Sequence, residues 1–426
     1  MLLYDIALHC AASFFLPKMG WKMLREGKYK KSFLKKMGAE FPIIIKKGKP
    51  LIWVHAVSYG ETKAIFPLVK KLQENFPSAQ FLFSSTTETG HAEAMRLFPK
   101  ENFGEVYHVY LPFDFSYVIN PIVERVKPDL VIITETDFWL NFIHAAKKEG
   151  ACIALANGKL SERSFSRFKM LSCFSKRLFS LFDLLCVQNI TYKERFEKLG
   201  VAPAKIHVTG NLKLDAPLLK LSIGEKEEWK KRLGISPEAL VITAGSTHDP
   251  EEQILLDDLF PLWEKYPHLK LILVPRHPER FDRVAALLEE KKISYSRYSG
   301  SPDCHARVTL VDAMGQLKNC YAVSDIAFVG GTLTSKVGGH NLIEPSFFGV
   351  PVLFGPYTYS QPDFHELLLS YEAGLPYSPF SLAQLIESKA ERENLGGNGL
   401  RLCQEAAGSC DKTHSYISSL LKNSLS

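Results

Sequence analysis

Residues 51–62 read Leu-Ile-Trp-Val-His-Ala-Val-Ser-Tyr-Gly-Glu-Thr, an apolar run that passes directly into polar residues able to begin a helix. The run is apolar throughout instead of alternating, which is typical of a strand in a parallel sheet that is covered on both faces. Similar runs recur along the chain between helical stretches, which predicts an α/β protein. The expected strands lie at residues 51–57, 80–84, 106–111, 130–134, 152–156, 184–188, 240–244, 269–274, 308–311, 326–329 and 351–354.

We predict two doubly wound, Rossmann-like domains, because the strands fall into two sets and 426 residues provide a full core for each. The first domain is expected at residues 50–210 and the second at residues 225–426, whose last helix is a candidate to pack back on the first domain. Residues 211–224 are the expected linker, because this region shows no clear periodicity and contains Pro217. Ligands of such sheets bind beyond the carboxyl ends of the strands, so the chemistry is expected in a central cleft between two facing domains.

The net charge of +6 is concentrated near the N-terminus. Residues 18–36 hold eight basic residues and one acid, so the rest of the chain carries a charge of −1. Before them, residues 1–17 contain 13 apolar residues, and Asp5, His9 and Ser13 recur every four residues as one polar stripe on a helix. We expect residues 1–17 to be a hydrophobic anchor helix, either inserted in the membrane or lying in its interface, and residues 18–49 to be a basic segment facing anionic lipid on the cytoplasmic side. A buried core helix is the alternative, and the nearly neutral body argues against a nucleic-acid partner.

Several common catalytic motifs are absent from the sequence. The chain has no G-x-x-x-x-G-K-[ST], no G-x-S-x-G, no H-E-x-x-H and no G-x-G-x-x-G after a strand, which disfavours a P-loop NTPase, an esterase, a zinc protease and an NAD dehydrogenase. It also lacks an Asp-x-Asp metal clamp for sugar diphosphates, so a metal-free site is expected.

Polar residues follow the first expected strand in a pattern that has two interpretations. Ser58 and Glu61 have the spacing of a capping box, in which each side chain satisfies backbone N–H groups at a helix start. Glu61 could equally serve as a general base, since it is a carboxylate at the end of a strand beside the expected cleft. Gly60 between them is expected to form a tight turn.

Glycines crowd the corresponding position of the second domain. Gly330 and Gly331 follow a strand, and Gly338 and Gly339 precede an expected helix, which would let a phosphate approach backbone N–H groups and the helix dipole. Asn341 and Glu344 have the spacing of an N-cap and third helical residue, so Glu344 is either a cap or a ligand of ribose hydroxyls.

Two other strand ends in the second domain carry polar residues. Ser246 and Thr247 place hydroxyls at an expected helix start, where they are either caps or ligands. Arg276 and His277 either provide a permanent cation that suits a phosphate or lie in a solvated turn. In the first domain, residues 159–177 mix six basic residues, among them Arg163, with three phenylalanines, which fits either a phosphorylated lipid or an amphipathic surface helix.

Together these motifs resemble one family, the 3-deoxy-D-manno-oct-2-ulosonic acid (Kdo) transferases of lipopolysaccharide assembly, and the resemblance extends from the N-terminus to about Gln361. Each motif alone is weak, but their shared order and spacing are specific. They are His55-Ala-Val-Ser-Tyr-Gly-Glu61, Thr134-Glu-Thr-Asp-Phe-Trp139, Asn157-Gly-Lys-Leu-Ser-Glu-Arg-Ser164, Gly210-Asn-Leu-Lys213, Gly245-Ser-Thr-His248, Pro275-Arg-His-Pro-Glu-Arg280 and Gly338-Gly-His-Asn-Leu-Ile-Glu-Pro345.

The resemblance implies a GT-B fold and an inverting, metal-independent glycosyltransferase without a cofactor. Such an enzyme transfers Kdo from CMP-Kdo to the 6′-hydroxyl of the lipid A precursor, lipid IVA, at the cytoplasmic face of the inner membrane. The N-terminal domain would bind the acceptor and the C-terminal domain the donor.

The resemblance also implies roles for individual residues. Glu61 corresponds to the catalytic base of the family. Acceptor-binding residues are expected to be Ser58, Gly60, Glu135 and Arg163. Donor-binding residues are expected to be Lys213, Ser246, Thr247, Arg276, His277, Met314, Gly315, Gly330, Gly331, Gly339, Asn341 and Glu344.

The sequence departs from the family pattern at two places on the acceptor side. The usual Glu-x-Glu-Leu-Trp-Pro reads Glu135-Thr-Asp-Phe-Trp-Leu140, and the usual Ala-Arg-Leu-Ser-Glu-Arg reads Gly158-Lys-Leu-Ser-Glu-Arg163. The number of Kdo residues added therefore stays open. A sugar-nucleotide epimerase with the same two-Rossmann fold is the alternative enzyme, and a basic binding module is the alternative without catalysis.

Overall fold

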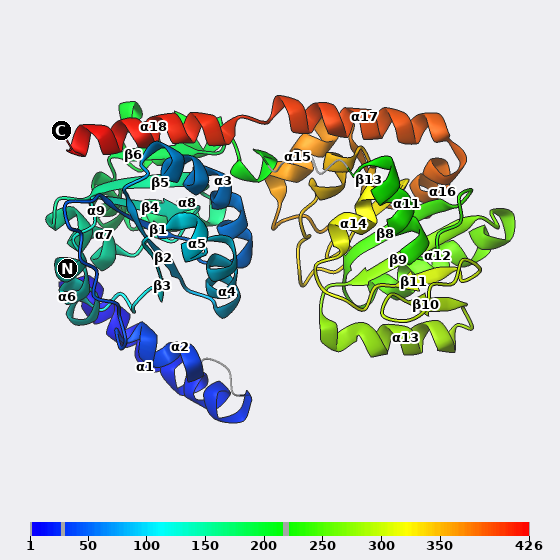
Figure 1. Ribbon diagram of the computed structural model, residues 1–426, viewed down its shortest axis with the longest axis horizontal. Coiled ribbons are helices and arrows are strands. Elements are labelled where there is room, and N and C mark those ends of the chain that lie inside the picture. The colour runs from blue at the N-terminus through cyan, green and yellow to red at the C-terminus, as the bar shows by residue number, and fades with distance from the viewer. Residues whose placement is uncertain (1, 27–29, 216–220, 426) are drawn as a thin grey trace. The chain divides into compact units, whose positions relative to one another are not determined.

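The computed structural model describes residues 2–26, 30–215 and 221–425. The chain forms two compact units, each an α/β structure with a central sheet (Figure 1). The first unit comprises Met1–Ala216 together with Ala406–Ser426, and the second comprises Pro217–Glu405. The C-terminal segment, which the sequence analysis assigned to the second domain, thus belongs to the first unit.

The first unit contains a parallel sheet of seven strands in the order β3-β2-β1-β4-β5-β6-β7. This order is that of a doubly wound Rossmann sheet with one added edge strand. The strands are β1 (Leu51–His55), β2 (Gln80–Ser85), β3 (Val106–Tyr110), β4 (Leu130–Thr134), β5 (Cys152–Gly158), β6 (Leu184–Val187) and β7 (Ile206–Val208). The helices after the N-terminal segment are α3 (Tyr59–Asn75), α4 (Glu88–Leu97), α5 (Lys100–Phe103), α6 (Ser116–Val126), α7 (Leu140–Lys148), α8 (Glu162–Met170), α9 (Ser172–Ser180), α10 (Ile190–Lys198) and α18 (Ser409–Leu425), with the 3₁₀ turns η1 (Pro203–Lys205) and η2 (Leu212–Asp215).

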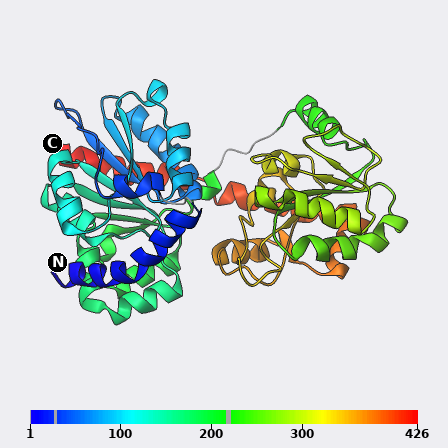
Figure 2. The same ribbon diagram turned by 90° about the horizontal axis from the view of Figure 1, so that it is seen from below.

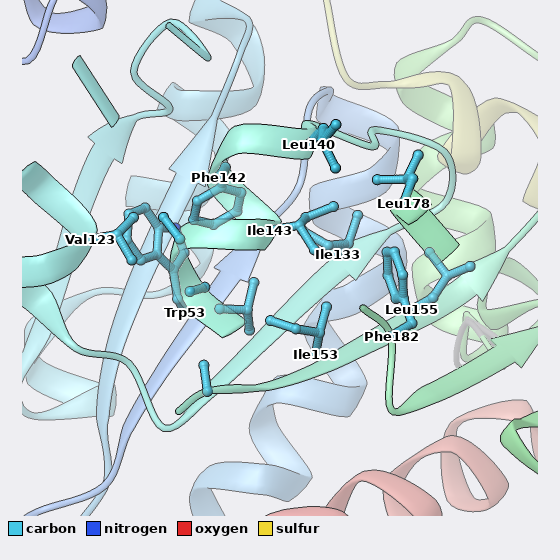
Figure 3. Packing of buried hydrophobic residues seen from close by; sticks show 14 of the residues in the cluster. Trp53, Val123, Ile133, Leu140, Phe142, Ile143, Ile153, Leu155, Leu178 and Phe182 are labelled. Atoms are coloured by element: carbon cyan, nitrogen blue, oxygen red, sulfur yellow. The ribbon is translucent and has the colours of Figure 1, made fainter. Parts of the chain in front are cut away.

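Both faces of this sheet are buried, which explains the apolar runs. Alternate residues of a strand point to opposite faces. Trp53 and Ile133 pack on one face against Phe142 of α7 (Figure 3), whereas Val54 packs on the other face with Ile65 of α3. All five residues of β1 are buried, so no position in this strand can be polar without an internal partner.

The second unit contains a parallel sheet of seven strands in the order β10-β11-β9-β8-β12-β13-β14. The strands are β8 (Leu240–Thr247), β9 (Leu269–Pro275), β10 (Tyr295–Arg297), β11 (Val308–Leu310), β12 (Ile326–Val329), β13 (Val352–Phe354) and β14 (Gly374–Pro376). The helices are α11 (Ile223–Arg232), α12 (Glu251–Lys265), α13 (Phe281–Glu290), α14 (Leu317–Ala322), α15 (Pro362–Ser370), α16 (Pro379–Glu387) and α17 (Lys389–Glu405), with the 3₁₀ turns η3 (Pro278–Arg280) and η4 (Glu344–Phe348).

The C-terminal helix α18 packs on the first unit, as both views show (Figure 1, Figure 2). Ile417 and Leu421 are fully buried in the core cluster that also contains residues of α3 and β6. Asp215, at the end of η2, accepts hydrogen bonds from the backbone N–H groups of Gly408 (2.6 Å), Ser409 (3.2 Å) and Cys410. This carboxylate caps the N-terminus of α18 and ties the two chain segments of the unit together.

The N-terminal helix α1 (Leu2–Glu26) continues through Pro17 into the expected basic segment and is followed by α2 (Lys30–Lys36). Its polar Asp5 faces the protein and accepts hydrogen bonds from the Ser116 N–H (3.1 Å) and the Asn141 amide (2.8 Å). Leu3 and Phe14 are each 83% exposed. Within the described part of the chain, no helix is both long enough and apolar enough to span a bilayer.

Candidate active site

In each sheet the strand order reverses between two neighbouring strands, β1 and β4 in the first unit and β8 and β12 in the second. The loops at the carboxyl ends of such a pair leave toward opposite faces and open a crevice, which is where doubly wound sheets bind ligands. The residues that follow these four strands are therefore the candidate site residues.

Glu61 lies in the first turn of α3, directly after β1. Its Oε2 accepts a hydrogen bond from the Val57 N–H (2.9 Å) and its Oε1 accepts one from the Ser58 hydroxyl (3.0 Å). Ser58 is the N-cap of α3, and its Oγ accepts a bond from the Glu61 N–H (3.4 Å). The capping interpretation is thus confirmed, and it leaves the carboxylate held in place at the crevice.

Burial raises the pKa of Glu61, and the negative charge of Glu135 raises it further. The bonds from Val57 and Ser58, and the nearby His55, lower the pKa but do not cancel these effects. A carboxylate with a raised pKa takes up a proton more readily than an ordinary glutamate, as a general base must.

Gly60 does not form the expected tight turn. It lies in the first turn of α3, is exposed, and has no positive φ. A Cβ added there would meet no atom within 4 Å. The glycine is therefore not required by the packing of the unit, and it leaves open space one residue before Glu61.

Glu135 follows β4 on the other side of the same crevice. It adopts a left-handed backbone conformation (φ 61°) and is buried, although it carries a charge. Its carboxylate forms ion pairs with Lys159 (Nζ–Oε2 2.7 Å) and Lys213 (Nζ–Oε1 2.7 Å), and the Asn157 amide donates to Oε1 at 3.3 Å. Burial alone would raise the pKa of Glu135, but the two lysines hold it below its usual value.

The predicted roles of Lys213 and Arg163 stay predictions, and the structure gives only the surroundings of each residue in the first unit. Lys213, expected with the donor-binding residues, contacts Glu135 in the first unit, because η2 is held there by the bond from the Leu212 N–H to Asn157 (3.0 Å). Arg163 is exposed on α8, and within the described chain no hydrogen bond or ion pair joins it to Glu61 or Glu135.

A buried polar network beside Glu61 was missed by the sequence analysis. His55, the last residue of β1, is fully buried, and its Nε2 lies 2.7 Å from Oδ2 of Asp137. The Trp139 indole donates to the same oxygen (2.7 Å), and Nδ1 of His55 lies 2.9 Å from the Ser84 hydroxyl. A histidine closing an otherwise apolar strand was the available signal, since a buried imidazole needs partners.

In the second unit, two histidines meet at the strand reversal. His248 follows β8, His340 lies in the loop after β12, and their Nε2 atoms are 2.7 Å apart. Arg276 and His277 follow the neighbouring strand β9. The His277 ring lies 5.3 Å from that of His248, and Arg276 is close enough to lower the pKa of both His248 and His340.

Three of the four glycines expected to approach a phosphate have their backbone N–H groups engaged within the protein. The N–H groups of Gly331, Thr332 and Leu333 donate to the buried carboxylate of Glu251 at 2.7–2.9 Å. The Gly330 N–H donates to the Gly245 carbonyl (2.8 Å). These backbone N–H groups are therefore already satisfied within the protein, and donor binding by these glycines stays a prediction.

Gly339, a further glycine of that prediction, is also bonded within the protein. The Gly339 N–H donates to the Gly331 carbonyl (2.7 Å). Gly330 is required for packing, since a Cβ there would collide with the Ser246 carbonyl. Close approach of one backbone segment to another thus accounts for Gly330.

The helix expected after Gly339 is also wrong. Asn341 and Glu344 do not occupy N-cap and third positions of an α-helix, because only the five-residue 3₁₀ turn η4 forms, and Glu344 is its first residue. The Asn341 side chain instead accepts a bond from the Ile343 N–H (3.3 Å) within the loop.

Ser246 and Thr247 do not lie at a helix start either. β8 continues to Thr247, and α12 begins at Glu251 after Pro250, with no side-chain cap. Ser246 takes a left-handed conformation (φ 56°) at a bulge against β9. Thr247 is fully buried, and its hydroxyl lacks a partner among the described residues.

The remaining residues that were predicted to bind the donor, Met314 and Gly315, lie after β11. Met314 is 53% exposed, and Gly315 has a φ of 84°, so it needs the conformational freedom of glycine. Asp312 fixes this loop by accepting bonds from the N–H (2.9 Å) and hydroxyl (2.6 Å) of Ser299. Across the described ranges, no group of three or more His, Cys, Asp or Glu residues is arranged to hold a metal ion.

Comparison with solved structures shows the fold. The UDP-GlcNAc 2-epimerase from Neisseria meningitidis matches with a TM-score of 0.61 at 16% identity, over 88% of this chain and 100% of that chain. Anabaena Alr3699/HepE in complex with UDP matches with a TM-score of 0.59 at 15% identity, over the same shares of the two chains. The GT-B type of two Rossmann-like units is thereby confirmed, and at these identities the likeness to an epimerase concerns the fold alone.

Sequence comparison shows the family. Residues 30–216 match the family model described as 3-Deoxy-D-manno-octulosonic-acid transferase (kdotransferase). The chain is 38% identical to the 3-deoxy-D-manno-octulosonic acid transferase of Chlamydia muridarum over 392 residues, which are 92% of this chain and 90% of that protein. It is 35% identical to the enzyme of the same name from Haemophilus influenzae over 374 residues, 85% of each chain. The chain therefore belongs to the Kdo transferase family and is a glycosyltransferase.

Proposed function

We propose that this enzyme transfers Kdo from CMP-Kdo to the 6′-hydroxyl of lipid IVA, with inversion and without a metal, and that Glu61 is the base. The observation that carries the proposal is the pair of carboxylates at the reversal between β1 and β4. The pKa of Glu61 is raised, whereas two lysines lower the pKa of Glu135 and keep it ionised. Two acids whose environments push their pKa values apart are typical of acid–base chemistry.

The reaction needs one proton acceptor on the acceptor side. The acceptor oxygen attacks the anomeric carbon of Kdo as its proton passes to Glu61, and the bond from that carbon to the phosphate oxygen breaks. Ser58 and Val57 hold the Glu61 carboxylate toward the crevice. Glu135 stays ionised and keeps a negative charge beside Glu61, which favours proton uptake.

On the donor side, the phosphate of CMP gains a negative charge as it leaves. Because the N–H groups of Gly330, Gly331 and Gly339 are engaged within the protein, side chains are the stabilising groups that we propose. Arg276 is half-buried after β9, and its side chain forms no ion pair within the described residues, so it is available to a phosphate.

The central test is Glu61→Gln in a transfer assay with CMP-Kdo and tetraacylated lipid A precursor. Turnover is expected to fall at least about 10²-fold, the low end for loss of a general base, while CMP binding is unchanged. The matched control is Glu225→Gln, which changes a glutamate at the same capping position of α11. In the wild-type enzyme, a chelator is expected to leave turnover unchanged, and the mass of the lipid product counts the Kdo residues added.

Near wild-type turnover of the Glu61→Gln variant would contradict the role of Glu61 as the general base. Release of CMP without any gain in lipid mass would contradict transfer to this acceptor. Loss of turnover with chelator, restored by a divalent metal, would contradict the metal-free mechanism.

We also propose that α1 binds the cytoplasmic face of the inner membrane. Asp5 of its polar stripe contacts the protein, while Leu2, Leu3 and Phe14 are 75%, 83% and 83% exposed. An apolar face turned outward, followed by a sequence of charge +7, fits a surface of anionic lipid.

Sedimentation with phosphatidylglycerol-containing vesicles tests this proposal. Leu3→Asp together with Phe14→Asp is expected to abolish binding, since each places a charge on the apolar face. Ile223→Asp is the matched control, because Ile223 is 80% exposed on α11 of the other unit. Undiminished binding of the double variant would rule out α1 as the contact.

A further inference from the structure

The reversal between β8 and β12 brings together two histidines from distant parts of the chain. His248 and His340 are 92 positions apart, their rings are nearly parallel (10°), and their centroids are 5.0 Å apart. Both are half-buried, and no other side-chain hydrogen bond of either imidazole occurs among the described residues.

The distance between the two Nε2 atoms dictates how protons are distributed. At 2.7 Å one ring must donate its Nε2–H and the other must accept it, because two N–H groups or two lone pairs would repel. The accepting ring then carries its own proton on Nδ1, and the donating ring has a free lone pair on Nδ1. One further proton can therefore be added at that Nδ1, and the pair then has charge +1 and an N–H donor on each Nδ1.

The surroundings keep this extra proton off the free protein. Burial lowers the pKa of both rings, and that of His340 falls to about 3. Cations on the neighbouring elements lower the pKa of the two rings further. The acids at the start of α12 are already engaged by Arg280 or by backbone N–H groups. The charged or titratable groups around the pair are Arg276, His277, Arg280, Glu251 and Glu252.

A dianionic phosphate beside the pair would reverse this balance, since it favours the charged form of an imidazole. We propose that His248 and His340 bind the phosphate of the cytidine nucleotide by taking up one proton from solvent. The inference rests on the proposed donor and adds a proton-coupled step to its recognition. The added proton lies on Nδ1 of the ring that donates within the pair, and no bond in the nucleotide changes.

A purely structural clamp is the competing explanation, because the same bond joins the loops after β8 and β12. Glutamine separates the two roles. His248→Gln and His340→Gln each retain a side-chain amide able to hydrogen bond, but an amide does not take up a proton near neutral pH.

Calorimetry of CMP binding in two buffers of different ionisation enthalpy measures the number of protons taken up. At about pH 8 CMP is itself a dianion, because the second pKa of a phosphate monoester is about 6. The wild-type enzyme is expected to take up protons when it binds CMP, and its Kd to rise as the pH is raised above this value. Either glutamine variant is expected to take up none and to bind CMP at least about tenfold more weakly.

His268→Gln is the matched control, since His268 is exposed just before β9, at the opposite end of the strand from Arg276. It should retain proton uptake and affinity. If the wild type binds CMP without proton uptake, the proposed role of the His248–His340 pair is wrong, whereas the proposed transfer reaction is not affected. Uptake that persists in His340→Gln but vanishes in His277→Gln would assign the proton to His277, and absence of CMP binding would reject both proposals.

Discussion

Glu61 and Glu135 show how one crevice gives two glutamates different chemistry. Both are withdrawn from solvent, and burial pushes both pKa values upward. Lys159 and Lys213 overcome that effect at Glu135. Glu61 forms no ion pair with a lysine or arginine in the described parts of the chain, and the charge of Glu135 raises its pKa further. The protein thus keeps one carboxylate ionised and the other ready to take up a proton.

This coupling predicts the effect of Glu135→Gln on the pH profile. Removal of the charge beside Glu61, with the two lysines left uncompensated, lowers the pKa of Glu61. Protonation of Glu61 then requires a more acidic solution, so the acidic limb of kcat/KM is expected to move to lower pH. Lys159→Met is expected to move the same limb to higher pH, because Glu135 is then less compensated. A limb that moves the same way in both variants would contradict the coupling.

Among the elements, those missed by the sequence analysis share one physical property. The strands β7, β10 and β14 are three residues long and lie at edges of the two sheets. An edge strand pairs on one side only and is less covered, so it does not need a continuous apolar run. The central strands were predicted to within a few residues because both of their faces are buried.

The first turn of α3 carries a prediction of its own. Gly60→Ala is expected to leave the free energy of unfolding unchanged or to raise it by up to about 1 kcal/mol, since alanine favours helix and no atom lies within 4 Å. If the acceptor approaches Glu61 over this turn, the added methyl is expected to raise the KM for the lipid about tenfold, with CMP affinity unchanged.

Gly397→Ala is the matched control for this variant, because Gly397 lies in α17 with equally open surroundings. Steady-state kinetics and chemical denaturation measure the two effects separately. Equal kinetics of both alanine variants would place the acceptor elsewhere.

At the scale of the whole molecule, the chain returns to its first unit after completing the second. Ile417 and Leu421 of α18, together with Cys410, complete a core whose other buried residues come from the first half of the sequence. Residues far apart in sequence therefore contribute to the stability of one unit.

Ile417→Ala is expected to destabilise the first unit by about 2–5 kcal/mol, the usual cost of truncating a buried aliphatic side chain. Hydrogen exchange followed by mass spectrometry should show faster exchange in β5, β6 and α3, and unchanged exchange in β8 and β9. Leu425→Ala, at a position that is 45% exposed, serves as the control. Faster exchange in the second unit instead would contradict the assignment of α18.

The sequence by itself determined the two parallel sheets and the Ser58–Glu61 cap, because these depend on burial of each strand and on contacts within one turn. Tertiary structure alone decided which polar groups meet. Glu251 accepts hydrogen bonds from backbone N–H groups of a loop 80 positions away. Lys213 forms an ion pair with Glu135, and His248 is hydrogen-bonded to His340. The physical reason is that a buried charge or N–H must find a partner, and the partner is chosen by the packing of strands, which no local pattern records.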